Sequence, residues 1–183
     1  TGNVELIQEW FKWWMEGSGL CAHITNVTSS YAAINVAGPK ARETLTKITQ
    51  LNLEPKSFRY MRSKEGLVAN IPTLLLRIGL VGETGWELHF PAEYAEYMWE
   101  SIMDVGKEYQ ITPFGVEAQR ILRLEKKHLI VNQDTDAVST PLSGDMAWAV
   151  KFDKDDFIGR SSLISARDSG YSEKLIGFNM KGS

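Results

Sequence analysis

The strongest constraint on the fold is a strict alternation of side chains between residues 85 and 91. The apolar residues of this stretch are Trp86, Leu88 and Phe90, and the polar ones between them are Glu87 and His89. Successive side chains of a β-strand point to opposite faces. The pattern therefore predicts a strand with one face in a hydrophobic core and the other turned away from it.

The hydrophobic periodicity of the remaining chain predicts a mixture of helices and strands. Helices are expected over residues 3–16, from 38, over 91–107 and 113–126, and from 158. Strands are expected over 23–27, 31–37, 85–90, 128–131 and 174–180, with two more around Pro72 within 66–80. Strands and helices do not alternate regularly, so we expect an α+β fold with a mainly antiparallel sheet.

Composition excludes several classes of protein. The 183 residues carry 20 Lys and Arg against 23 Asp and Glu, for a net charge of −3, and this argues against nucleic acid as the main partner. No apolar run approaches the roughly 18 residues of a membrane span. Cys21 is the single cysteine, which excludes an intrachain disulfide and favours a reducing, cytoplasmic location. A first residue of Thr1 without a signal-peptide pattern suggests a fragment or processed form.

Two polar groups could carry chemistry. Glu87 on a strand could accept two parallel hydrogen bonds from an amidine-like edge such as that of a pterin, or it could be an exposed or ion-paired side chain. Arg120, Arg123 and Glu125 share a predicted helix. Local ion pairs are the simple interpretation, and an arginine presented to a ligand carboxylate is the alternative.

Metal binding is not expected. Acidic residues alternate over 132–136, but this loop lacks the glycine and the bidentate glutamate that an EF-hand requires. The three histidines, His23, His89 and His128, show no spacing typical of metal ligands.

The N-terminal helix carries more aromatic residues than one buried stripe requires, namely Trp10, Phe11, Trp13 and Trp14. We expect a contact surface for another subunit or a second copy. The alternative is that the helix packs between two halves of its own chain.

Five short motifs in a fixed order resemble the folate-binding aminomethyltransferase family, which includes the glycine-cleavage T-protein. They lie at residues 36–42, 82–87, 122–125, 133–136 and 156–160. Residues 111–115 and 131–136, with the Trp-rich start, look most like the C-terminal part of the sarcosine oxidase alpha subunit and dimethylglycine dehydrogenase. The resemblance implies interleaved ferredoxin-like units, truncated before a C-terminal β-barrel. Residues 1–65 would end the first folate-binding subdomain, 66–170 would form the second α+β subdomain, and 171–183 would start the barrel.

The resemblance also implies a site. Glu87 would hold the pterin edge, with Leu80, Gln119 and Arg123 as further folate-binding residues. Relatives often carry Tyr where this chain has Leu80, and the T-protein has Arg where Gln119 stands. The family's catalytic Asp lies upstream of residue 1 in this numbering, so no residue here is expected to take that role.

The implied function is capture of a one-carbon iminium by tetrahydrofolate, giving 5,10-methylenetetrahydrofolate, in a sarcosine oxidase or dimethylglycine dehydrogenase-type system. Flavin would be bound only by a partner domain or subunit, and the chain by itself is expected to be inactive. The alternative is a non-catalytic folate-binding or structural subunit of the same fold.

Overall fold

The computed structural model describes residues 3–180, and these form two compact units. The first unit contains the residues up to 79 together with 83–112, and the second contains 80–82 together with 113 onward. Each is described by itself below. The subdomain boundaries after residues 65 and 170 stay a prediction.

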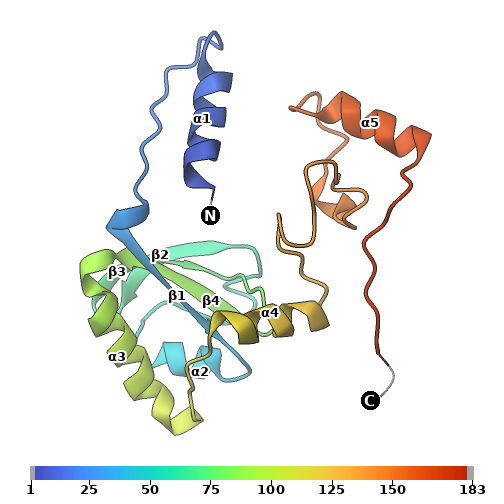
Figure 1. Ribbon diagram of the computed structural model, residues 1–183. Helices are drawn as coiled ribbons and strands as arrows, with labels where there is room; N and C mark the ends of the chain where they lie inside the picture. The colour runs from blue at the N-terminus through green and yellow to red at the C-terminus, as the bar shows by residue number, and fades with distance from the viewer. Residues whose placement is uncertain (1–2, 181–183) are drawn as a thin grey trace. The chain divides into compact units, whose positions relative to one another are not determined.

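The first unit is built on one antiparallel sheet of four strands, in the order β1-β4-β3-β2 (Figure 1). The strands are β1 (Tyr31–Ala37), β2 (Ser63–Val68), β3 (Ile71–Leu76) and β4 (Gly85–Pro91). All three pairings are antiparallel. The expected α+β fold with a mainly antiparallel sheet is thus confirmed.

Two helices, α2 (Ala41–Thr46) and α3 (Ala95–Gly106), pack against one face of this sheet (Figure 1). Their buried residues, including Leu45 and Met98, join the core formed by Trp86, Leu88 and Phe90 of β4. These three β4 side chains are 0% exposed. Burial of a large apolar side chain contributes about 1.5–3 kcal/mol, so this face of β4 is strongly specified.

A tight hairpin joins β2 to β3. Ala69 and Asn70 form its turn with φ angles of 48° and 66°, and two successive positive φ angles give the strand twist that two-residue hairpins favour. Pro72 lies inside β3 but outside Leu74–Leu76, the part that pairs with β4. Its missing N–H therefore removes no hydrogen bond to β4.

The first unit also contains α1 (Val4–Met15), in the place that the sequence predicts. No residue of this helix is buried. Trp13 is 73% exposed and Trp10 is 42% exposed.

The second unit contains α4 (Val116–Glu125) and α5 (Arg160–Ser169), a short 3-10 helix at Ala147–Ala149, and long irregular segments. Further 3-10 turns occur in the first unit at Thr28–Ser30, Ala92–Tyr94 and Lys107–Tyr109. No helix within residues 3–180 is long and apolar enough to cross a bilayer.

Three expected strands are wrong, because no neighbouring strand pairs with them. Residues 23–27 and 174–180 have no regular structure, and most of their side chains are exposed. Residues 128–131 are irregular too. There the carbonyl of His128 accepts a hydrogen bond from Arg123, and the N–H of Ile130 donates to Asp134. The side chains of Arg123 and Asp134 thus form hydrogen bonds with backbone groups that would bond to a neighbouring strand in a sheet.

Candidate functional site

The face of the sheet opposite α2 and α3 carries Glu87. This residue lies on β4, between β1 and β3 in the sheet. Its neighbours Trp86 and Leu88 are buried on the helix-covered face, so the alternation of a strand turns Glu87 to the other face. The side chain of Glu87 is 35% exposed. The orientation predicted from the sequence is therefore confirmed.

Glu87 contacts His89, which is two residues further along the same face. The Nε2 atom of His89 lies 3.3 Å from Oε2 of Glu87, and the His89 side chain is 32% exposed. A proton on Nε2 can be donated to this carboxylate oxygen, while Oε1 makes no hydrogen bond to any of residues 3–180. The contact restricts the carboxylate and leaves acceptor positions open for a ligand.

The strands beside β4 surround Glu87 with partly apolar surface. Asn35 of β1 and Leu76 of β3 lie directly opposite Glu87, and Leu74 lies opposite His89. Directly paired residues of antiparallel strands share a face, with Cβ atoms about 4.5–5.5 Å apart. Asn35, Leu74 and Leu76 are each half-buried. A flat ligand on this face would meet one carboxylate, one amide and two aliphatic side chains.

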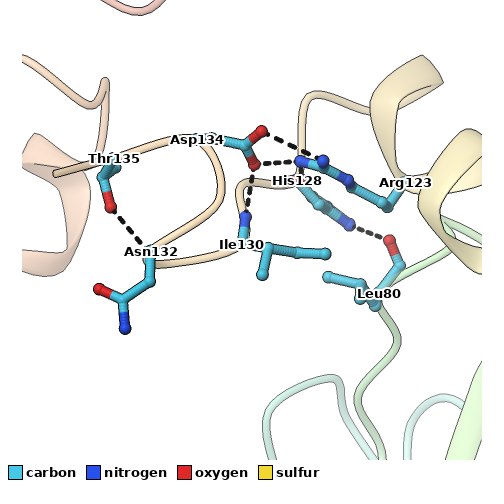
Figure 2. Close-up of polar contacts among 7 residues, drawn as sticks. All are labelled: Leu80, Arg123, His128, Ile130, Asn132, Asp134 and Thr135. Atoms are coloured by element: carbon cyan, nitrogen blue, oxygen red, sulfur yellow. Dashed lines mark hydrogen bonds and ion pairs between the residues drawn. The ribbon is translucent and has the colours of Figure 1, made fainter. Parts of the chain in front are cut away.

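In the second unit, Arg123 is enclosed at the end of α4. Its side chain is 2% exposed, and both terminal nitrogens bond to Asp134 (Figure 2). Arg123 also donates to the carbonyl of His128 at 3.0 Å. The charge of this guanidinium is thus already compensated within the chain.

Asp134 also binds the backbone of the loop that follows α4. Its carboxylate accepts a 2.7 Å hydrogen bond from the N–H of Ile130 (Figure 2). The hydrogen bond from Arg123, and next that from Ile130, hold the pKa of Asp134 below its ordinary value. Charge-assisted bonds of this kind favour the ionised carboxylate.

Leu80 is joined to this cluster through His128. The Nδ1–H of His128 donates to the Leu80 carbonyl at 2.5 Å (Figure 2). Gly82, two residues later, packs so closely on Lys126 that an added Cβ would lie 2.0 Å from its Cγ. The segment 80–82, which leads into the turn before β4, is therefore fixed against the end of α4.

The four expected site residues fall into two places. Leu80 and Arg123 are brought together by His128, and Gln119 lies one helical turn before Arg123 on α4. Glu87 belongs to the other unit. On α4, Arg120 forms the local ion pair that helical spacing favours, but with Glu117.

Sequence reasoning missed Asn35, His89, His128 and Asp134 as members of these clusters. The alternation that identified Glu87 also placed His89 on its face, but the position of Asn35 depends on the β1–β4 register. The sequence places Asp134 in an acidic loop and in the motif at 133–136, but neither indicates Arg123 as its partner. Across residues 3–180, no three His, Cys, Asp or Glu side chains group in a way that could hold a metal ion.

Comparison with known proteins gives consistent similarities. A family profile described as GCVT N-terminal domain matches residues 1–154. An aminomethyltransferase of Halothermothrix orenii is 32% identical over 180 residues, covering 98% of this chain and 50% of that protein. One of Caldanaerobacter subterraneus is 35% identical, covering 99% and 48%. The chain thus spans about half the length of these curated relatives.

Two further similarities concern larger oxidoreductases. Human mitochondrial dimethylglycine dehydrogenase is 34% identical over 159 residues, which cover 86% of this chain and 18% of that protein. A solved structure of heterotetrameric sarcosine oxidase from Corynebacterium sp. U-96, in complex with pyrrole 2-carboxylate, is 23% identical. It matches with a TM-score of 0.47, over 54% of this chain and 49% of that one.

Proposed function

Because the chain belongs to the family of GCVT N-terminal domains, we propose that it binds tetrahydrofolate for aminomethyl transfer. The observation that carries the proposal is the half-buried carboxylate of Glu87 on the face of β4 opposite α2 and α3. A carboxylate there can accept parallel hydrogen bonds from the N3–H and 2-amino groups of a pterin.

The residues around Glu87 fit such a ligand. His89 contacts one carboxylate oxygen and leaves the other available, and Leu74 and Leu76 offer apolar surface to a planar ring. A partly desolvated carboxylate interacts more strongly with a hydrogen-bonded partner than an exposed one does. When bound, tetrahydrofolate would supply the nitrogen nucleophiles N5 and N10 that capture a one-carbon iminium; the C–N bond of the iminium would break, the amine would leave with the two protons of N5 and N10, and the product would be 5,10-methylenetetrahydrofolate.

The other proposed folate-binding residues have different parts in this scheme. Leu80 and Gln119 are proposed as flanking contacts, apolar and polar respectively. Arg123 is enclosed and paired with Asp134, so its proposed contribution is to hold the loop after α4 and, through His128, the segment that contains Leu80. Positioning of this kind can contribute several kcal/mol to lowering a barrier.

The similarity to dimethylglycine dehydrogenase supports a place in a system of that type or of the sarcosine oxidase type. There the iminium would come from a flavin site on a partner domain or subunit. The second candidate is a non-catalytic folate-binding or structural subunit. The neutral Gln119, where the T-protein has an arginine, favours this candidate, because it removes a cation that could bind a ligand carboxylate.

Calorimetric titration with tetrahydrofolate tests the proposal. We expect saturable binding that Glu87→Gln weakens about 10- to 100-fold, since net hydrogen bonds to charged groups contribute about 1.5–3 kcal/mol. Glu65→Gln is the matched control, because Glu65 is exposed on the same face, opposite Leu74. A titration of the wild-type chain without saturable heat would contradict folate binding and favour the structural subunit.

A further inference from the structure

Asn35 lies beside Glu87 on the face of the sheet opposite α2 and α3. It lies directly across from Glu87 in the β1–β4 register, so the two side chains share a face and stand about 5 Å apart at Cβ. Asn35 is half-buried. Among residues 3–180 its side-chain amide has no hydrogen-bond partner. A half-buried amide without a protein partner has its donor and acceptor available to a ligand.

The two side chains offer complementary hydrogen-bonding groups. The amide of Asn35 can donate through its NH₂ group, whereas the ionised carboxylate of Glu87 only accepts. His89, which contacts Oε2 of Glu87, lies on β4 itself, whereas Asn35 lies on the neighbouring strand β1. The pair therefore offers one donor and two acceptor positions, which are the groups that a carbonyl, an N–H and an amino group require.

We propose that Asn35 and Glu87 together recognise the 2-amino-4-oxo edge of the pteridine ring, and that Asn35 determines selectivity for the 4-oxo group. Glu87 accepts from N3–H and the 2-amino group, and Asn35 donates to the oxygen at position 4. This inference rests on the proposed function, which required only the contact with Glu87. The same edge occurs in guanine, so the test below includes guanosine.

The selectivity follows from the reversal of hydrogen-bonding groups in a 4-amino analogue. Such a ring presents a donor at position 4 and lacks the proton on N3, so Asn35 and Glu87 would each face a mismatched group. A site built to hydrogen-bond a ligand group discriminates strongly against an analogue that cannot pair with it. Leu74 and Leu76, being apolar, contribute to both ligands equally.

Calorimetry with tetrahydrofolate and tetrahydroaminopterin, which differ only at position 4, tests the inference. We expect the wild-type chain to prefer tetrahydrofolate about 10- to 100-fold. Asn35→Leu, similar in volume and without a donor, should reduce this preference by about threefold or more, and the part that Glu87 contributes through N3–H should remain. Asn35→Ser keeps a hydroxyl donor and should retain part of the preference, and Glu65→Gln should leave it unchanged.

The outcomes separate the two proposals. If Glu87→Gln weakens tetrahydrofolate binding while Asn35→Leu preserves the wild-type preference, the role of Asn35 is wrong and folate binding stands. If the wild-type chain does not bind tetrahydrofolate, or Glu87→Gln leaves the affinity unchanged, the proposed function fails and this inference with it. Guanosine should bind far more weakly than tetrahydrofolate, and an equal affinity would overturn the assignment of a pteridine.

Discussion

Replacement of Asp134 by asparagine is expected to loosen the loop that follows α4. Asp134 is the shared acceptor for both terminal nitrogens of Arg123 and for the N–H of Ile130. Asparagine has nearly the same shape but no charge, so it leaves a guanidinium that is 2% exposed without its counterion. The change therefore tests the electrostatic contribution with little change in packing.

The size of the effect follows from burial. Removal of one partner from a fully buried ion pair costs about 3–5 kcal/mol. Asp134 is 18% exposed, and asparagine keeps one oxygen that can accept, so the lower figure of about 2–3 kcal/mol is expected here. Since about 1.4 kcal/mol corresponds to a factor of ten, local opening should increase about 30- to 150-fold.

Hydrogen exchange with mass spectrometry measures this opening directly. Peptides covering residues 126–136 should lose protection in Asp134→Asn, whereas peptides from β4 should not. The control is Glu117→Gln, because Glu117 pairs with Arg120 on the same helix but is 79% exposed. An exposed pair contributes well under about 1 kcal/mol, so exchange of residues 126–136 should change little.

Two results would refute the reasoning. If Asp134→Asn leaves exchange over 126–136 within about twofold of wild type, the ion pair does not hold the loop. If Glu117→Gln has an effect of equal size, burial is not what distinguishes the two pairs. A uniform loss of protection over both units would instead show that Asp134 stabilises the whole chain.

Three further predictions concern pH, a turn and assembly. The pKa of Asp134 lies below its ordinary value of 3.8 in the folded chain, so the stabilisation from this carboxylate is present above pH 3.8 and is lost as the pH falls below it. The free energies of unfolding of wild type and Asp134→Asn in urea should therefore become equal in acid, and a difference that does not change with pH would contradict this. Gly82 has a φ of 80° and an added Cβ there would also meet Lys126, so Gly82→Ala should lower the melting temperature by more than the backbone cost of about 1–2 kcal/mol alone. Gly159→Ala, where φ is 90° but a Cβ meets open space, should show only the backbone cost, and equal shifts would argue against a contribution from Lys126. The exposed aromatic residues of α1 should make the chain self-associate or bind another subunit. Sedimentation at tens of micromolar should show species above 20.6 kDa, and Trp13→Ser should reduce their amount. A single species of 20.6 kDa would be evidence against self-association.

The sequence by itself determined the elements whose patterns are local. The alternation around Glu87 identified β4 and the face that this side chain occupies, and helical spacing located α1, α3 and α4. These predictions succeed because side-chain direction repeats every two or 3.6 residues, so neighbours in sequence report the buried face. The motifs likewise identified the family, because their order along the chain is a property of the sequence alone.

Only the tertiary structure decided which distant residues meet. The register of β1 against β4 places Asn35 opposite Glu87, and a shift of one residue would have turned Asn35 to the core. Helical spacing could not show that Arg123 pairs with Asp134, eleven residues away, while Arg120 pairs locally. Residues 128–131 have the composition of a strand, but no strand lies beside them, and Arg123 and Asp134 bind their backbone instead. Long-range pairing depends on which of all the segments bury each other and form hydrogen bonds most favourably. A local sequence pattern does not show which segments these are.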